Sequence, residues 1–408
     1  MIDSPYFARS LDTVLARAAR EFPAVVLTGP RQAGKTTLLR HQFGATHRYV
    51  SLELPDVQAA AAADPRGFLE LNPPPVIFDE IQYAPGLLPY IKETIDALRM
   101  ARGRYLLTGS QNLLLAERIT ETLAGRAAFL RLLPLAHREQ IGQPASPLPW
   151  ETRKRNLARP RLGVNELWAS LLRGSYPELA DEPGRDAALW HSSYIQTYLE
   201  RDVRALRQVG DRMLFQNFLR ALAARCGQLL NLSDVARDLG IAVNTTKAWL
   251  SVLEATFQVL VLRPYFANVG KRLVKTPKVY FTDTGTLCAL VGLRSPEHAA
   301  SGPIGGALFE NAVIVEVFKT LVHRGQEPQL YFWRTSSGQE VDLLVDNGEQ
   351  IIPIEIKRSA TPHPNMTAGI AALREALGPR VGPGWLVHPG DTQLPLGANV
   401  QSLPFAEL

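Results

Sequence analysis

Residues 29–36 constrain the fold of this chain more strongly than any other segment. They read Gly-Pro-Arg-Gln-Ala-Gly-Lys-Thr and match the spacing G-x-x-x-x-G-K-[ST] of a phosphate-binding loop. The apolar residues 25–27 before the loop predict a buried strand, and residues 37–39 after it predict the start of a helix. Because this motif requires a strand, a loop and a helix in that order, the segment predicts an α/β nucleotide-binding fold.

Each motif residue has an expected role. Gly29 and Gly34 let the backbone curl so that its N–H groups point at phosphate oxygens, and the helix N-terminus attracts negative charge. Lys35 would reach the β- and γ-phosphates, the Thr36 hydroxyl would hold Mg²⁺, and Thr37 would contact the nucleotide. The loop therefore predicts ATP and Mg²⁺ as ligands.

An acidic strand end downstream supports this interpretation. Residues 76–78 are apolar and are followed by Asp79 and Glu80. A buried strand that ends in two acids is typical of a Walker B strand. Asp79 would serve Mg²⁺, and Glu80 would orient and polarise the attacking water.

Four further polar residues are candidates for the same site. Thr108 and Ser110 follow a buried strand and would sense the γ-phosphate, although Ser110 is nearly as well explained as a helix cap. Arg126 would stabilise phosphate charge in its own subunit or a neighbouring one, and a structural surface arginine is an equal alternative. Arg201 is a second arginine-finger candidate.

These motifs resemble a known family. The segments GPRQAGKTTLL, FDEIQ, YLLTGSQ and LAGR look like prokaryotic AAA-type ATPases whose C-terminal half is a domain of unknown function. The later segments GSYPEL, TPKVYFTDTG, FEN, EVD and EIK extend the resemblance over nearly the whole chain. The resemblance implies a homo-oligomer, with a hexameric ring as the expected form.

Composition limits the remaining classes of protein. The chain has 408 residues and 46% hydrophobic content, as expected for two or three packed domains. Its net charge of +5 is compatible with binding to nucleic acid. Cys226 and Cys288 lie in apolar surroundings and predict buried thiols. The absence of a signal-peptide pattern or a membrane-spanning apolar run predicts a cytoplasmic protein with no membrane partner.

The middle of the chain predicts a winged helix. Residues 232–240 (LSDVARDLG) predict a short helix capped by Ser233 and ended by Gly240, and Asn244 or Thr245 would cap a second helix. Strand-like segments follow and would form a wing. Such a module binds DNA or serves as a structural or protein-docking module, and the sequence favours DNA contact without base-specific readout.

Basic residues of this module are the candidate DNA contacts. Lys247 lies on the second helix and the hairpin tip is richer in positive charge. The remaining basic surface would come from Arg263, Lys271, Arg272, Lys275 and Lys278. A basic run at residues 153–155 is better explained as a solvated loop.

The C-terminal third contains a spaced carboxylate set. Glu310 falls in an expected helix that begins at residues 309–311, Asp342 falls in an expected strand, and Glu355 and Lys357 alternate on the next strand. This arrangement resembles the PD-(D/E)XK nuclease core. The resemblance implies Mg²⁺ held by the acids, with Glu340 as a further ligand, and a water positioned by Lys357; cleavage activity and its absence stay equally open.

The sequence thus predicts an α/β protein with three parts: a P-loop AAA-type ATPase domain, a helical and winged-helix middle, and a C-terminal α/β nuclease-like domain. The expected boundaries are 1–140, a linker at 141–164, then 165–295 and 296–408. The favoured function is an ATP-hydrolysing ATPase that acts on DNA, with double-stranded, branched or junction DNA as partner. The alternatives are a regulatory NTPase switch that assembles or remodels proteins, and an ATP-gated, Mg²⁺-dependent DNA nuclease.

Overall fold

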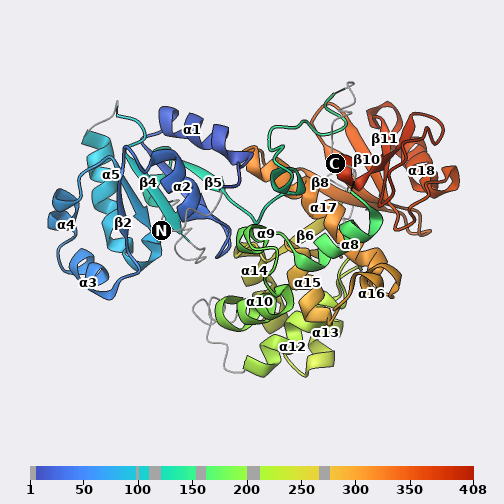
Figure 1. Cartoon of the computed structure of the whole chain (residues 1–408), viewed down its shortest axis with the longest axis horizontal. Helices are drawn as coiled ribbons and strands as arrows, with labels where there is room; N and C mark the ends of the chain where they lie inside the picture. The colour runs from blue at the N-terminus through green and yellow to red at the C-terminus, as the bar shows by residue number, and fades with distance from the viewer. Residues whose placement is uncertain (1–5, 98–100, 110–120, 153–161, 200–211, 266–275) are drawn as a thin grey trace.

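Two β-sheets organise the chain. The computed structural model describes residues 6–97, 101–109, 121–152, 162–199, 212–265 and 276–408 (Figure 1). A smaller sheet is built from the first third of the chain, and a larger one from its second half. Figure 1 shows them in two lobes, with the N-terminal lobe in blue and cyan and the C-terminal sheet in orange and red.

The first sheet is parallel throughout and has five strands. Its strands are β1 (Ala24–Thr28), β2 (Arg48–Ser51), β3 (Val76–Asp79), β4 (Tyr105–Gly109) and β5 (Ala127–Arg131). They lie in the order β2-β3-β4-β1-β5. Since parallel strands all end at the same edge, the residues that follow β1, β3 and β4 share one edge of the sheet.

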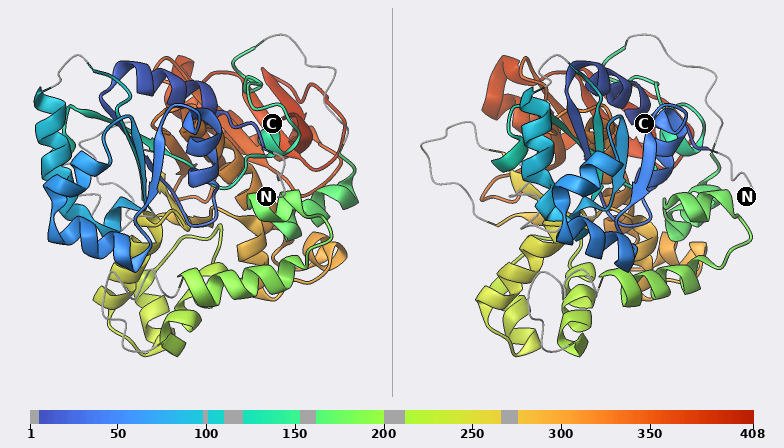
Figure 2. Two further views of the ribbon diagram at one scale, coloured as in Figure 1. Left: turned by 60° about the vertical axis from the view of Figure 1, so that its left-hand side comes forward. Right: turned by 90° about the vertical axis from the view of Figure 1, so that its left-hand side faces the viewer.

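Helices cover both faces of this sheet, which explains its continuous apolar strands. Alternate residues of β1 enter two separate cores: Val25 and Leu27 pack with α1 and α2, and Ala24 and Val26 pack with residues of α3 and α5. Figures 1 and 2 show the helices on the two sides of the sheet. The helices are α1 (Leu11–Glu21), α2 (Lys35–Phe43), α3 (Pro55–Ala63), α4 (Pro65–Leu71) and α5 (Leu88–Ala97).

A helical region follows the first sheet. It comprises α7 (His137–Gln140), α8 (Val164–Arg173), α9 (Pro177–Asp181), α10 (Ala187–Tyr194), a π-helical turn (Ile195–Leu199), α12 (Arg212–Ala223), α13 (Leu232–Leu239), α14 (Val243–Ala255), α15 (Thr284–Val291) and α16 (Pro296–Ser301). The helix pair α13 and α14 lies where the sequence predicts it, and Gly240 ends α13 in the left-handed conformation at φ 66°.

The caps of this helix pair differ from the predicted ones. Asn231, not Ser233, is the N-cap of α13, and its side chain accepts the N–H of Ser233. Helix α14 begins at Val243 after Ala242, so neither Asn244 nor Thr245 caps it. Asparagine and serine cap helices about equally well, so the sequence alone did not distinguish the two positions.

The second sheet has seven strands. They are β6 (Val259–Pro264), β7 (Lys278–Phe281), β8 (Leu330–Arg334), β9 (Glu340–Asp346), β10 (Ile351–Ile356), β11 (Gly384–His388) and β12 (Val400–Pro404), in the order β12-β11-β10-β9-β8-β6-β7. Helices α17 (Gly305–His323) and α18 (Ala368–Leu377) pack against it. Helix α17 begins four residues before the expected start at 309.

The expected boundary at residue 295 does not interrupt the structure. The hairpin β6–β7, predicted to be the wing of a separate module, pairs in parallel with β8 and so extends the C-terminal sheet. One hydrophobic core runs from Leu133 through the helical region to Leu408. The middle and C-terminal segments therefore form one packed body.

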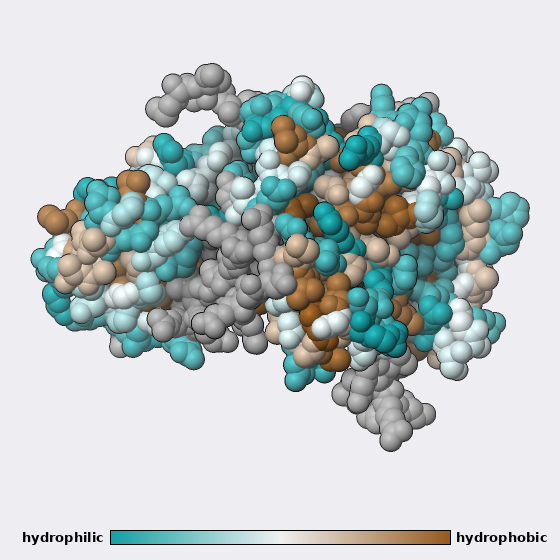
Figure 3. Space-filling view, turned by 90° about the horizontal axis from the view of Figure 1, so that it is seen from below, coloured by the Kyte–Doolittle hydropathy of each residue, from teal (hydrophilic) through white to brown (hydrophobic). Residues whose placement is uncertain are grey.

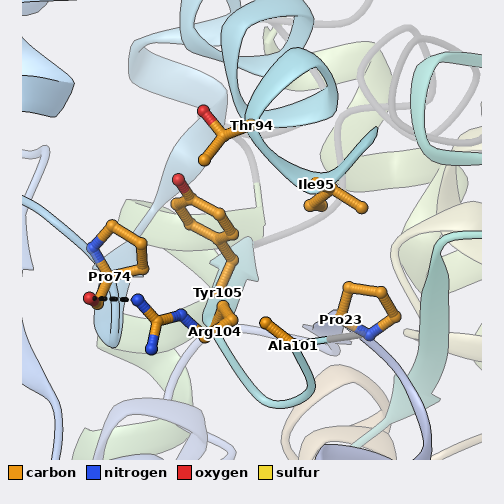
Figure 4. A pocket seen from close by; sticks show the side chains of 7 residues that line it. All are labelled: Pro23, Pro74, Thr94, Ile95, Ala101, Arg104 and Tyr105. Atoms are coloured by element: carbon orange, nitrogen blue, oxygen red, sulfur yellow. Dashed lines mark hydrogen bonds between the residues drawn. The ribbon is translucent and has the colours of Figure 1, made fainter. Parts of the chain in front are cut away.

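A small pocket lies where β1, β3 and β4 begin. A pocket of only about 10 Å³ lies among Pro23, Pro74, Arg104 and Tyr105, where Arg104 donates to the Pro74 carbonyl at 2.8 Å (Figure 4). This space fits about one water molecule. Figure 3 shows the underside, largely hydrophilic over the N-terminal lobe, with apolar residues gathered nearer the middle. Among the described helices, none is long and apolar enough to cross a bilayer.

Candidate functional site

The phosphate-binding loop connects β1 to α2. Gly34 lies at the N-cap of α2 with φ +92°, a conformation that favours glycine, and α2 has no acidic residue in its first turn. Gly29 has φ +151°, and a β-carbon there would lie 1.9 Å from the carbonyl oxygen of Leu132. The loop therefore requires glycine at both ends, and its helix presents an N-terminus suited to an anion.

Lys35 is held inside the loop. Its Nζ donates to the carbonyl oxygens of Gly29 at 3.1 Å and Pro30 at 2.9 Å, and the residue is 5% exposed. The side chain thus lies along the loop, with its ammonium among backbone carbonyls.

The predicted metal ligands meet at the shared edge of the sheet. Thr36 Oγ1 donates to the Asp79 carboxylate, at 2.9 Å from Oδ1 and 3.0 Å from Oδ2. Tyr49 donates its hydroxyl to Asp79 Oδ2 at 2.8 Å, and Thr108 donates to Oδ1. The Asp79 carboxylate is therefore fixed by three hydroxyl donors from different segments.

Glu80 follows β3 in an unusual backbone conformation. Its φ of 60° and ψ of 54° are left-handed, and its N–H donates to Thr108 Oγ1 at 2.9 Å. Its carboxylate accepts from the Gln82 amide. This turn directs the Glu80 side chain toward the loop, because Glu80 lines the cavity described next.

An open cavity of about 450 Å³ lies over the loop. This volume lies within the usual range for ligand sites. The wall carries both charge signs and the motif residues: Arg31, Gln32, Gly34, Lys35, Thr36, Thr37, Glu53 and Glu80. Every predicted nucleotide-binding residue except Gly29 lines the cavity. Gly29 lies at the start of the loop, close to the backbone of Leu132.

The residues present fit a magnesium nucleotide. Thr36 and Asp79 supply a hydroxyl and a carboxylate within hydrogen-bond distance of each other, and these are oxygen ligands of the kind that Mg²⁺ prefers. Thr37 lies on the first turn of α2 and lines the cavity.

Sequence reasoning missed a buried network behind the loop. Arg9 donates to the carbonyls of Ala33 at 3.1 Å and Leu133 at 2.6 Å, and to Glu139 Oε2 at 3.0 Å. His323 of α17 faces Glu139 Oε1 at 3.0 Å through Nδ1, and its Nε2 accepts the N–H of Leu133. The network ties the phosphate-binding loop to the C-terminal body.

Charges in this network follow from its geometry. Burial alone would raise the pKa of Glu139, but the Arg9 charge and several hydrogen bonds hold that pKa below its usual range. Burial lowers the pKa of His323, so His323 is neutral and donates its Nδ1–H to Glu139.

The other nucleotide-site candidates have different positions from those expected. Arg126 precedes β5, and Ala127 is in register with Ala24 at the start of β1, so Arg126 lies at the opposite edge from the loop. It pairs with Asp96 at 2.6 Å. A role in its own subunit is therefore wrong, while a role in a neighbouring subunit stays a prediction.

Thr108 is fully buried, and its hydroxyl donates to Asp79. Its contact with the γ-phosphate stays a prediction. Ser110 and Arg201 lie outside the described residues.

The C-terminal carboxylates lie near one another but are bound to lysines. Asp342 Oδ2 accepts the N–H of Ile356 at 2.7 Å and lies 3.4 Å from Lys357 Nζ. Lys357 also donates to Glu355 at 2.7 Å. Burial, together with the charge of Asp342, raises the pKa of Glu355 to about 8.

Glu310 has separate partners. Lys278 Nζ lies 3.0 Å from Glu310 Oε1, and Tyr280 donates its hydroxyl to the same oxygen at 2.5 Å. Lys278 also pairs with Glu340 at 2.6 Å. Lys278 is only 4% exposed, so its predicted place on a basic DNA-binding surface is wrong.

This second set does not fit the metal that the nuclease resemblance implies. Within the described ranges, no group of three or more histidine, cysteine, aspartate or glutamate side chains is arranged to hold a metal ion. Lys278 instead contacts Glu310 and Glu340, and Lys357 contacts Asp342 and Glu355, so each of the four acids has a lysine ammonium beside it.

Of the candidate DNA contacts, Lys247 is described and is exposed on α14, as is Arg263 on β6. Lys271, Arg272, Lys275 and the basic run at 153–155 lie outside the described residues.

The two cysteines, Cys226 and Cys288, are buried free thiols, as predicted.

Comparison with known proteins identifies relatives over the whole chain. An uncharacterized protein of Mycobacterium tuberculosis is 33% identical over 397 residues, which cover 96% of this chain and 82% of the relative. An uncharacterized protein of Mycobacterium bovis matches equally well. The chain belongs to the same family as these two mycobacterial proteins. A more distant member, from Haemophilus influenzae, is 22% identical and covers 81% of each chain.

Three segments of this chain match family models. Residues 21–141 match the family described as AAA domain, residues 164–297 a domain of unknown function (DUF8612), and residues 305–408 another (DUF4143). The first match covers the phosphate-binding loop and the Asp79 strand, so the N-terminal sheet is that of an AAA-type P-loop domain.

Three solved structures with partly similar folds are distant in sequence. The Walker-type ATPase of Pyrococcus abyssi is 16% identical, with a TM-score of 0.44, covering 70% of this chain and 96% of its own. The RuvB Holliday junction branch migration motor of Thermotoga maritima is 16% identical, with a TM-score of 0.29, and covers 62% and 85%. The Orc1 protein of Aeropyrum pernix, in complex with DNA, is 16% identical, with a TM-score of 0.28, and covers 69% and 90%. Likeness at this level carries no functional inference.

Proposed function

We propose that this chain hydrolyses ATP with Mg²⁺ and uses the energy to act on DNA as a homo-oligomer. The observation that carries the hydrolysis is the meeting of Thr36 with Asp79 at the edge where Lys35 and Glu80 line one cavity. A phosphate loop, an oxygen ligand pair and an adjacent carboxylate are the parts that hydrolysis of a nucleoside triphosphate needs.

The roles follow from the geometry. The loop N–H groups and the start of α2 would bind the phosphates, and the Lys35 ammonium would exchange its carbonyl partners for phosphate oxygens. Thr36 and Asp79 would hold Mg²⁺, which neutralises phosphate charge when bound. Glu80 would orient the attacking water, and Gln82 holds its carboxylate in the structure.

Two substitutions test hydrolysis in the full chain. Lys35→Ala should abolish ATP binding measured by calorimetry, because it removes the phosphate-facing ammonium. Glu80→Gln should keep ATP binding and slow hydrolysis by about 10²-fold or more. Lys92→Ala on α5 is the matched control and should change neither. ATP hydrolysis that survives both substitutions would refute this site.

Action on DNA is supported by more limited observations. The helices α13 and α14 follow one another as the two helices of a DNA-binding helix-turn-helix do, and Lys247 is exposed on α14. The chain carries a net charge of +5. These features favour contact with DNA phosphates without base readout.

The alternative is a switch that assembles or remodels proteins. DNA-dependent ATPase assays distinguish the two. We expect forked or double-stranded DNA to stimulate hydrolysis at low salt, and Lys247→Ala to weaken stimulation relative to Lys92→Ala. Sizing the Glu80→Gln protein with ATP and forked DNA tests the expected ring. Hydrolysis indifferent to DNA, with no binding at low salt, would favour the protein switch.

A further inference from the structure

A buried lysine lies inside the C-terminal carboxylate set. Lys278 begins β7, and its ammonium contacts Glu310 Oε1 at 3.0 Å and Glu340 Oε1 at 2.6 Å. Its side chain is 5% exposed and lies over the Phe332 ring, with 5.5 Å between Nζ and the ring centroid. An ammonium in this setting is held by the two carboxylates and is largely shielded from water.

The fold brings this lysine from another part of the chain. In the sheet order, β7 lies three places from β9, yet Lys278 of β7 reaches Glu340 at the start of β9. Helix α17 packs on β7 and supplies Glu310 to the same ammonium. Tyr280, two residues further along β7, donates to Glu310 as well. Strand β7 thus presents two donors to the carboxylates.

These contacts join two segments that match separate families. Lys278 and Tyr280 fall within residues 164–297, while Glu310 and Glu340 fall within residues 305–408. The second segment supplies the carboxylates, and the first supplies the cation beside them. Lys357 contacts the remaining pair, Asp342 and Glu355.

A divalent cation needs the same oxygens that these ammonium groups use. Mg²⁺ binds carboxylate oxygens at about 2.0–2.1 Å in near-octahedral geometry. Glu310 Oε1 already accepts hydrogen bonds from Lys278 and Tyr280. A metal at this position would lie next to the Lys278 ammonium, a positive charge whose side chain is only 5% exposed.

We propose that Lys278 occupies the cation position of this carboxylate set, so that the set binds no divalent metal in the native chain. The lysine then acts as an internal counter-ion that fastens β7 to α17 and β9. The nuclease-like arrangement is, in this form, a lysine–carboxylate joint between the two segments and not a metal centre. This inference is independent of ATP hydrolysis.

Binding of Mn²⁺ to the nucleotide-free full chain tests the proposal, with free Mn²⁺ measured by electron paramagnetic resonance. The native protein and Asp342→Asn should bind Mn²⁺ equally. Lys278→Met should bind Mn²⁺ at least tenfold more tightly than the native protein, and adding Glu310→Gln should remove that gain. Lys247→Met, at an exposed lysine on α14, is the matched control and should behave as the native protein.

Two results would overturn the proposal. The first is native Mn²⁺ binding that Asp342→Asn removes, because the set would then hold a metal despite Lys278. The second is a folded Lys278→Met protein, checked by circular dichroism, that gains no binding. Lys278→Gln keeps a donor for Glu310 and serves if the methionine variant does not fold. If neither variant folds, the comparison of native protein with Asp342→Asn decides: equal binding supports the proposal and loss of binding overturns it.

Discussion

Glu139 is the residue whose replacement should cost this protein most stability for least change in shape. Its side chain is fully buried and accepts hydrogen bonds from Arg9 Nε at 3.0 Å, Ser10 N at 2.8 Å, Ala136 N at 2.9 Å and His323 Nδ1. Glu139→Gln keeps the volume but turns one acceptor into a donor and removes the charge that faces Arg9. The Arg9 side chain is only 4% exposed, so its charge would stay buried without a counter-charge.

The expected loss is about 3–5 kcal/mol in the free energy of unfolding, the usual result of breaking one partner of a buried pair. Urea denaturation of the full chain, followed by tryptophan fluorescence, measures it. The matched control is Glu151→Gln, which breaks an ion pair between Glu151 and Arg324 at 2.8 Å that is more exposed. The control should cost about 0–1 kcal/mol.

The same substitution has a functional readout. Because Arg9 also donates to the Ala33 carbonyl of the phosphate-binding loop, Glu139→Gln should weaken ATP binding, whereas Glu151→Gln should not. A loss of stability below about 1 kcal/mol would refute the assigned charge pair. Unchanged ATP affinity in a destabilised protein would show that Arg9 supports the fold without positioning the loop.

Three other predictions concern single side chains. Thr108→Val should lower the ATPase rate and leave the fold intact, because it removes one hydroxyl donor to Asp79 and the acceptor of the Glu80 N–H; a steady-state rate equal to the native one would contradict the positioning role. Arg126→Ala should leave ATP affinity unchanged in titration calorimetry, because Arg126 lies at the far edge of the sheet; a tenfold weaker affinity would contradict that placement. Glu355 should make stability depend on pH: its folded pKa of about 8 lies above the ordinary 4.5, so the folded state holds a proton that the unfolded state releases. The stability of the native protein relative to Glu355→Gln should therefore fall as pH rises from 4.5 to 8, by up to about 1.4 kcal/mol per pH unit, and parallel pH curves in urea denaturation would refute the raised pKa.

The nucleotide site was predictable because its functional residues lie in short contiguous segments of the sequence. Residues 29–36 and 76–80 each contain a strand end and the reactive groups that follow it. The sheet then only has to be parallel for Thr36 and Asp79 to meet, and the alternation of strands with helices predicts that. The buried strands and most helices follow from apolar periodicity for the same reason.

Long-range partners could not be predicted from such local patterns. Arg9 and Glu139 are 130 residues apart, and nothing near either residue indicates the other. Lys278 follows a basic segment, which predicts a solvent-exposed side chain. In the structure the side chain is buried in contact with Glu310 and Glu340. Since a lysine is buried only when partners neutralise it, its location depends on residues that the local sequence does not specify.

Helix α17 shows how these hidden partners shape the whole molecule. Glu316, Lys319 and His323 follow one another at helical spacing, so they share one face of a helix that is buried over most of its length. Glu316 accepts the N–H of His137 at 2.7 Å, and Lys319 donates to the carbonyl of Leu135 at 3.2 Å.

This face of α17 therefore forms hydrogen bonds with the backbone of residues 133–137, the segment that follows the last strand of the nucleotide-binding sheet. Buried polar contacts of this kind are costly to break because each freed group loses its hydrogen bond without regaining water. The two lobes cannot rotate freely about the expected linker at 141–164 while these contacts hold. We therefore expect ATP-driven movement to occur between subunits of the proposed oligomer, with the phosphate-binding loop and the C-terminal sheet of each chain moving together through Arg9, Glu139 and His323.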